Sequence, residues 1–346
     1  MSERKSYRRN TRQWLKRLGG FFLLAYLLTF LWHQVKPMPE GTVASCDFHP
    51  VSEEQIEFLY DLTYTSSTGE RVNEQTIFDT VFSLIDHAES FVVLDFFLLN
   101  QFQGISNDSH RHLSVELIDH VLQRKLAQPS LQVLLITDPI NTIYGGRVSP
   151  LLQKLKQADI DVVYTDIDRL RDSNPVYSSL WRVLFQWLGN DTKTTWLSNP
   201  FQENGEKISL RSWLRLLNFK ANHRKVIIAD SPDGQINAVI TSANPHDASS
   251  AHSNVAFHVQ GNAAIALLES ELAVAEFSAK KSIAAIPVPA YTSMSSQQDG
   301  FEAACITEVE IRHRLLNWFD QADDADEIDI AVFYLADRKI VQSLIA

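Results

Sequence analysis

The chain has 346 residues, of which 45% are hydrophobic and 21% charged, and its formal net charge is −11. This composition excludes a disordered or fibrous chain, and the length is enough for two domains with real cores. Its two cysteines, Cys46 and Cys305, are too few for a disulfide scaffold. The acidic balance makes nucleic acid an unfavoured partner, because phosphate backbones are attracted to basic surfaces.

The amino terminus differs in charge and hydropathy from the rest of the chain. Residues 1–17 hold seven basic residues and one acidic residue, so they carry +6 and the remaining residues carry −17. Residues 18–35 are uncharged apart from His33 and are just long enough to cross a bilayer. The basic flank predicts that residues 1–17 are a cytoplasmic tail and that the body lies on the outer side. A cleaved signal peptide and a buried helix are the alternatives.

Helical and strand-like segments alternate through the first half of the body. A linker at 36–54 is followed by a predicted short helix at Glu54–Tyr60. Helical spacing then alternates with apolar runs that predict buried strands. The predicted helices are Thr76–Ser90, Leu113–Leu126 and Leu151–Ala158, and the predicted strands are Phe91–Leu98, Leu131–Thr137 and Ile160–Thr165. The alternation predicts an α/β fold in which helices cover a sheet.

An insertion at 167–215 interrupts this pattern. It contains Ser178–Leu188, a helical segment with two tryptophans and several leucines. Such a segment either touches lipid, covers a site, or packs against the core like most apolar helix faces.

A polar constellation surrounds the predicted strand Val226–Ala229. Side chains alternate along a strand, so His223 and Lys225 share one face. After a turn, the strand Asn237–Thr241 returns and brings Ser242 and Asn244 towards the start of the first strand. An imidazole, an ammonium, a hydroxyl and a carboxamide together suit a phosphate group.

The pattern His223-x-Lys225-x4-Asp230, followed by Ser242-x-Asn244, resembles the phospholipase D superfamily. The resemblance implies a layered α/β/α lobe with a mixed sheet and cleavage or transfer of phosphodiesters through a phosphohistidine. It implies His223 as the nucleophile, Lys225, Ser242 and Asn244 as phosphate ligands, and no metal or cofactor.

Asp230 belongs to the same catalytic motif, but strand parity turns it away from the phosphate and indicates a structural role. The sequence departs from the family's pattern at Thr241, where a glycine is frequent. It also has Asn254 as the nearest candidate for the group that orients the histidine, where many members have an acidic residue.

The carboxyl-terminal part is similar to the beginning of the lobe. Ile85–Ala88 leads into the apolar run Val92–Leu98, and Phe319–Ala322 leads into Ile328–Leu335, a further predicted strand. We therefore expect the limits 55–277 for the lobe, 278–303 for a second linker and 304–346 for the start of an incomplete second lobe. The second motif that the resemblance implies would come from a missing second lobe or from a homodimer.

Three functions remain open at this stage. The first is a membrane-anchored enzyme that hydrolyses phospholipids or transfers phosphatidyl groups, as in cardiolipin-type lipid synthesis, and that is expected to be inactive as this chain alone. The second is a phosphodiesterase or endonuclease with the same chemistry. The third is an inactive binding protein tethered to the membrane.

Overall fold

The computed structural model of the protein describes residues 2–44, 47–102, 111–191, 195–202, 205–291, 301–332 and 334–345. Among these residues, eight strands form one mixed sheet in the order β3-β2-β9-β8-β7-β4-β5-β6. β4, β5 and β6 are parallel and the other pairs are antiparallel. The strands are β2 (Ile56–Thr65), β3 (Arg71–Glu74), β4 (Phe91–Phe96), β5 (Gln132–Thr137), β6 (Asp161–Tyr164), β7 (Lys225–Asp230), β8 (Ile236–Thr241) and β9 (Asn254–Gln260).

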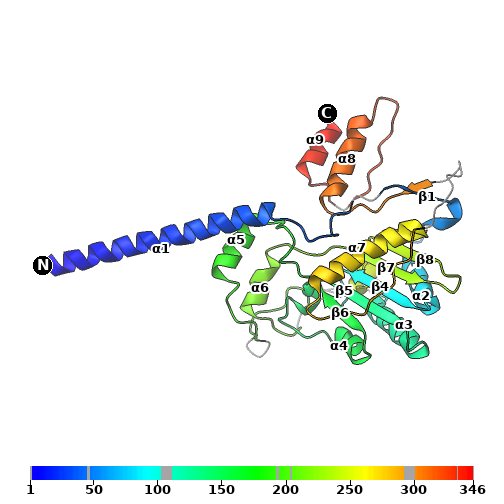
Figure 1. The fold of residues 1–346 in the computed structure, drawn as a ribbon, viewed down its shortest axis with the longest axis horizontal. Coiled ribbons are helices and arrows are strands. Elements are labelled where there is room, and N and C mark those ends of the chain that lie inside the picture. Colours follow the sequence, from blue (N-terminus) through cyan, green and yellow to red (C-terminus); the bar gives the residue numbers. More distant parts are fainter. Residues whose placement is uncertain are drawn as a thin grey trace.

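Helices cover both faces of this sheet, so the predicted α/β/α fold is confirmed (Figure 1). On one face lie α2 (Ile77–His87), α3 (Leu113–Ala127) and α4 (Pro150–Gln157), and on the other lies α7 (Asn262–Ser278). The central strand β4 supplies both cores, because successive side chains point to opposite faces. Leu94 packs on the α2 side and Val93 on the α7 side, each about 1% exposed.

The hairpin that carries the polar constellation forms as the sequence predicts. β7 and β8 pair with Ala229 opposite Asn237. Between them, the turn at 231–235 closes with a hydrogen bond from the Gly234 amide to the Ser231 carbonyl. Gly234 has φ +79°, a left-handed conformation that glycine adopts without strain. β7 lies beside β4, so the hairpin is held in the middle of the sheet.

Two sequence predictions of local structure are wrong. Glu54–Tyr60 is not a helix but a 3₁₀ turn followed by β2, in which Leu59 is buried while Phe58 is exposed. Pairing with β9 along six residues outweighs the local helical spacing. Ile328–Leu335 is not a strand in its described residues, which find no strand to pair with and stay exposed.

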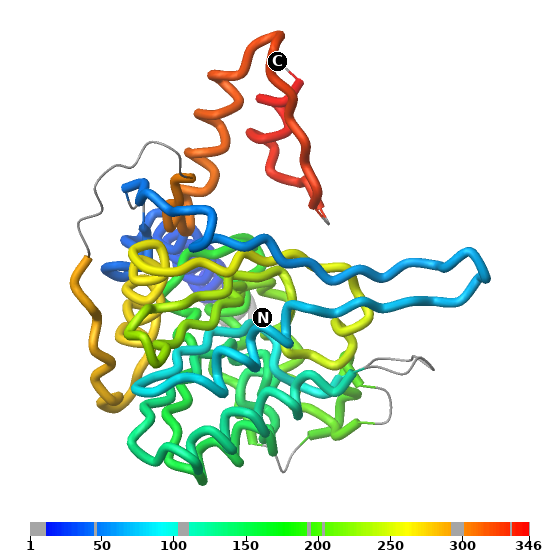
Figure 2. Tube along the Cα trace, turned by 90° about the vertical axis from the view of Figure 1, so that its right-hand side faces the viewer, coloured from blue at the N-terminus to red at the C-terminus, as the bar shows by residue number. Residues whose placement is uncertain are grey.

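The two segments expected to be linkers each contribute a short strand. β1 (His49–Val51) pairs with β10 (Phe301–Ala303), which ties the start of the body to the chain before α8. The helices α8 (Val309–Gln321) and α9 (Arg338–Ile345) contact each other and project from the sheet (Figure 2).

The amino-terminal helix α1 (Ser2–Val35) extends away from the body, which it meets at its carboxyl-terminal end (Figure 1). Its segment Arg12–Val35 is the one described helix long and apolar enough to cross a membrane. No part of that segment is buried inside the protein, unlike a core helix. Helix α5 (Pro175–Leu184) of the insertion contacts α1, and α6 (Leu210–Leu216) is hydrogen-bonded to α5.

Candidate active site

The structure brings together His223 and Lys225 at the start of β7. The Lys225 Nζ lies 3.2 Å from the His223 Nδ1 and donates to the His223 carbonyl oxygen at 2.8 Å. The imidazole is exposed, whereas the lysine is buried. An exposed ring next to a buried cation is an arrangement that a phosphate can approach from solvent.

Phe97 completes the immediate surroundings of this pair. Its ring centroid lies 4.7 Å from that of His223 and 5.3 Å from the Lys225 Nζ. Its amide donates to the Arg224 carbonyl at 3.1 Å, which fixes the end of β4 against the start of β7. Local sequence does not indicate a role for Phe97, because its neighbour β7 lies far along the chain.

The protein environment keeps the imidazole neutral. Loss of hydration, and then the positive charge of Lys225, lowers the pKa of His223 to about 4. Burial also lowers the pKa of Lys225, to about 8, against the opposing effect of Asp95. Near pH 7 the pair is therefore a neutral imidazole beside a mostly protonated lysine, which suits a nucleophile better than an acid.

Asn244 lies at the same edge of the sheet as this pair. Its side chain is buried, and its Oδ1 accepts a hydrogen bond of 3.0 Å from the Leu98 amide, next to Phe97. The Asn244 amide group is thus held beside the end of β4 rather than free to rotate.

Ser242 and Asn254 bind each other. The Ser242 Oγ donates to the Asn254 Oδ1 at 3.0 Å and accepts from the Val255 amide at 3.0 Å. The Asn254 Nδ2 donates to the His252 carbonyl. These contacts place Asn254 against Ser242, and none of its described hydrogen bonds reaches His223.

Asp230 lies at the opposite end of β7. Its carboxylate accepts hydrogen bonds from the amides of Glu89, Ser90 and Phe91 at 2.9–3.1 Å. At about 3.3 Å per residue, the strand separates it from His223 by roughly 20 Å. The structure therefore does not bring Asp230 to the end of β7 where His223 and Lys225 lie.

Asn222, which precedes the histidine, is held by the ends of three strands. Its backbone N–H donates to the Asp138 carboxylate at 2.8 Å. Its side-chain Nδ2 donates to the Asp95 carboxylate at 2.7 Å and to the Thr165 hydroxyl at 3.0 Å. Burial raises the pKa of Asp138 to about 7, and the same carboxylate caps a 3₁₀ turn by accepting from the Ile140 amide. Through its hydrogen bond to Asn222, Asp138 fixes the backbone next to His223.

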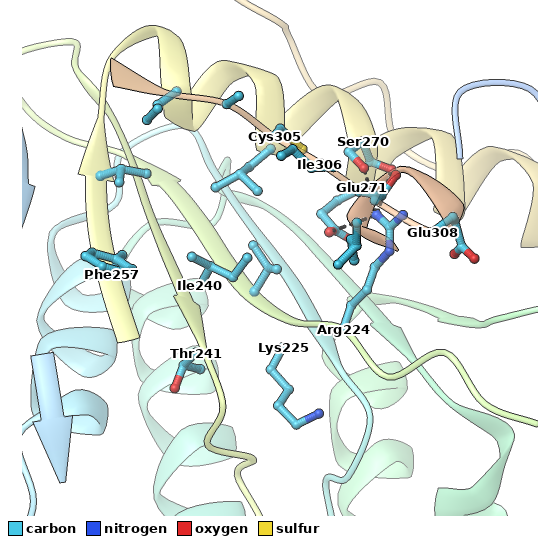
Figure 3. A pocket seen from close by; sticks show the side chains of 18 of the residues that line it. Arg224, Lys225, Ile240, Thr241, Phe257, Ser270, Glu271, Cys305, Ile306 and Glu308 are labelled. Carbon is cyan, nitrogen blue, oxygen red and sulfur yellow. Dashed lines mark hydrogen bonds and ion pairs between the residues drawn. The ribbon is translucent and has the colours of Figure 1, made fainter. Parts of the chain in front are cut away.

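Arg224 points to the other face of the sheet, as strand alternation requires. It donates to Ser270 at 2.8 Å and to Glu271 at 3.1 Å, while Lys225 points away from them (Figure 3). Burial and then the charge of Glu271 raise the pKa of Asp95 well above its usual range. The groove of about 850 Å³ on this side extends from Arg224 and Glu271 to His223 and Lys225, which also line it.

A second pocket adjoins the site on the Phe97 side. It has a volume of about 370 Å³ and is lined by Phe97, Leu98, Ile140 and His246, among others. Its walls are mostly apolar, so they suit a hydrocarbon group next to a phosphate. In the described part of the chain, no group of three or more His, Cys, Asp or Glu side chains is arranged to hold a metal ion.

No protein-family model matches the chain, and no curated protein matches it. Solved structures similar to it include Nuc from Salmonella typhimurium, a phospholipase D family member, at 14% identity over 65% of this chain and 94% of that chain, with a TM-score of 0.31. NucT from Helicobacter pylori matches at 12% identity over 63% and 94%, with a TM-score of 0.31. A phosphatidylserine synthase from Haemophilus influenzae matches at 11% over 62% and 35%, with a TM-score of 0.32. These scores are too low to support an assignment of substrate or activity.

Proposed function

We propose that this chain is a membrane-anchored phosphodiesterase or phosphatidyltransferase of the phospholipase D type, with phospholipids as substrates. The observation that carries the proposal is the contact of 3.2 Å between a neutral, exposed imidazole and a buried lysine. These are the two groups that a covalent attack on phosphorus needs. Their spacing as His223-x-Lys225, with Asn244 at the same sheet edge, supports the motif resemblance.

In the proposed reaction, a nitrogen of His223 attacks phosphorus and forms a P–N bond while the P–O bond to the leaving alcohol breaks. Lys225 neutralises the charge that develops on the non-bridging oxygens. The leaving oxygen takes a proton from a general acid, for which we propose the histidine of a second His-x-Lys motif. Water or an alcohol then attacks the phosphohistidine, which gives hydrolysis or transfer and frees His223.

Substrate binding also changes the hydrogen bonding of His223. With Nδ1 accepting from Lys225, the proton of the neutral ring lies on Nε2. When phosphate oxygens replace Nδ1 as the acceptor for Lys225, Nδ1 becomes free to carry the proton. Nε2 then has the lone pair needed for attack, so Lys225 both recruits the phosphate and releases the imidazole.

Three observations favour a lipid over a nucleic acid. The residues after position 17 carry −17, which opposes a polyanionic substrate. Helix α1 has a segment long enough to cross a bilayer. The pocket next to Phe97 is mostly apolar.

Covalent trapping with a phospholipid radiolabelled in its phosphatidyl group tests the proposal. The full chain in lipid nanodiscs should acquire an acid-labile label, which His223→Ala abolishes. His252→Ala is the matched control, because it removes an exposed imidazole on a nearby loop. Labelling by an oligonucleotide phosphodiester but not by phospholipid would establish the nuclease alternative, and label retained in His223→Ala would reject this nucleophile.

A further inference from the structure

Helix α5 has its polarity inverted. Its buried face carries Ser178, Ser179 and Arg182, together with Trp181. Its outward face carries Val176, Leu180 and Leu184, which are 61%, 39% and 45% exposed. These three lie four residues apart, so they form one stripe along the helix. A helix on the surface of a protein in water has the opposite arrangement, with the apolar stripe facing the core.

The neighbouring helix α6 repeats the inversion. Its buried residues are Ser212 and Arg215, whereas Leu210 and Trp213 are exposed. Tyr177 of α5 donates to the Leu214 carbonyl at 2.9 Å, so the two helices belong to one unit. Trp187, just after α5, is 77% exposed.

The inward-facing arginines Arg182 and Arg215 are each paired with a carboxylate. Arg182 forms two hydrogen bonds of 2.5 and 2.6 Å with the fully buried carboxylate of Asp172, which also binds Lys220 at 3.0 Å. Arg215 donates to Asp168 at 2.6 Å and lies 4.3 Å from the Trp181 ring. Breaking the buried Arg182–Asp172 ion pair is costly, so it fixes which side of α5 faces outward. The exposed apolar stripe is therefore built into the fold, and exposed apolar patches of this kind mark interaction sites.

Helix α5 lies directly against α1. The Tyr26 hydroxyl donates to the Val176 carbonyl at 3.3 Å, and the Asp172 amide donates to the His33 carbonyl at 3.3 Å (Figure 1). Arg171 also donates to the Lys36 carbonyl at 3.0 Å. From Tyr26 to the end of α1 is about 14 Å at 1.5 Å per residue. If the apolar part of α1 crosses a bilayer, the start of α5 reaches into the leaflet on the body's side.

We propose that the outward faces of α5 and α6 dock into the interfacial region of the bilayer that α1 spans. This proposal rests on the membrane anchor of the proposed function. Leucine and valine contact the acyl chains, and Trp187 and Trp213 lie at the headgroup level, where tryptophan is favoured. The docked unit leads directly to the site, because exposed Phe219 lies four residues before His223. The phosphate-binding end is thereby held at the membrane surface.

Depth-dependent quenching in the full chain tests this docking. Single cysteines replace Leu184, Leu23 and Leu126 in turn, in a background with Cys46→Ser and Cys305→Ala, and each carries an environment-sensitive fluorophore. Leu126 is the matched control, since it is 82% exposed at the end of α3. In vesicles of phosphatidylcholine and phosphatidylglycerol, the Leu184 label should be quenched several-fold more than the Leu126 label by nitroxide lipids. A nitroxide near the headgroups should act more strongly on it than one deep in the chains.

The Leu23 label distinguishes failure of the anchor from failure of the docking. Quenching at Leu23 with a solvent-like signal at Leu184 would overturn the docking and leave the anchor intact. A Leu184 signal that is shielded from water, untouched by nitroxide lipids and dependent on protein concentration would also overturn it, because a second copy would then cover the stripe. Absence of quenching at Leu23 would reject the anchor, whereas quenching at Leu184 would still support the docked stripe.

Discussion

The two ends of strand β7 carry polar residues of one motif in opposite environments. At the first end, His223 is exposed, and loss of hydration lowers the pKa values of both His223 and Lys225. At the other end, three backbone amides bind the carboxylate of Asp230. One end thus keeps reactive groups available to a ligand, and the other uses its polar group to hold the sheet together.

This contrast shows that membership of a motif does not imply one role. The Asp230 carboxylate links the end of β7 to the residues just before and at the start of β4, its neighbour in the sheet. That link fixes the register that places Phe96 opposite Lys225 and so brings Phe97 to His223 and Lys225. We therefore infer that Asp230 serves the reaction through the position of β4, not through contact with the substrate.

The largest expected effect comes from His223→Ala. The variant should lose about 10⁴-fold or more in kcat, because no other described group of the site replaces the nucleophile. Its melting temperature should change little, since the side chain is exposed. Turnover of a phosphatidyl substrate and a thermal melt measure the two effects. Substantial turnover in a folded variant would show that the catalytic end of β7 has been misassigned.

Lys225→Met should have the next largest effect. It removes the ammonium but keeps a side chain of similar length in a buried place, and the loss of transition-state stabilisation should lower kcat by about 10²–10³-fold. Because the Lys225 charge contributes to the lowered pKa of His223, that pKa should rise from about 4 towards its ordinary value. Loss of hydration remains and keeps it below that value. An NMR titration of the ring measures the change, and an unchanged pKa would contradict the electrostatic contact.

The pH dependence of the reaction should report the ionisation of His223 and Lys225. The active form has a neutral His223 and a protonated Lys225, so kcat/KM should fall below about pH 4 and above about pH 8. Each loss should approach tenfold per pH unit. In Lys225→Arg the alkaline loss should disappear, because arginine stays protonated. If the loss of kcat/KM at alkaline pH persists unchanged in this variant, that loss reports the ionisation of a group other than Lys225.

The β7–β8 hairpin, and which of its side chains share a face, can be predicted from local sequence. An apolar run, a turn with Gly234 and the alternation of side chains are enough to predict that His223 and Lys225 share a face. The apolar strands and helical spacings of residues 76–165 likewise predict the layered fold. Their boundaries in the structure lie within a few residues of the predicted ones, for example Phe91–Phe96 for the predicted strand Phe91–Leu98.

The supporting residues depend on the order of strands, which local patterns do not contain. Phe97, Asp138 and Asn222 meet because β7 lies next to β4 and β4 next to β5. The one available signal was Asp95, a carboxylate within an otherwise apolar strand, which indicates a buried polar contact. The predicted helix Glu54–Tyr60 is wrong for the same reason: the pairing partner of this segment, β9, lies about two hundred residues further along the chain.

The smallest expected effect on activity, and the sharpest test of the contrast, comes from Asp230→Asn. The amide keeps one carbonyl oxygen for the backbone amides of Glu89, Ser90 and Phe91 but loses the charge and places an NH₂ group opposite N–H donors. Weakened or unpaired hydrogen bonds of this kind cost about 1–3 kcal/mol in the free energy of unfolding. The value of kcat at a temperature where the variant is folded should change by less than about threefold, since an interaction lost in the ground and transition states alike leaves the barrier unchanged.

Asp119→Asn on the exposed side of α3 is the matched control and should leave both the free energy of unfolding and kcat unchanged. Urea unfolding measures the free energy of unfolding, and turnover assays measure kcat. A large loss of kcat in Asp230→Asn with normal stability would place Asp230 in the reaction and remove the distinction between the two ends of β7.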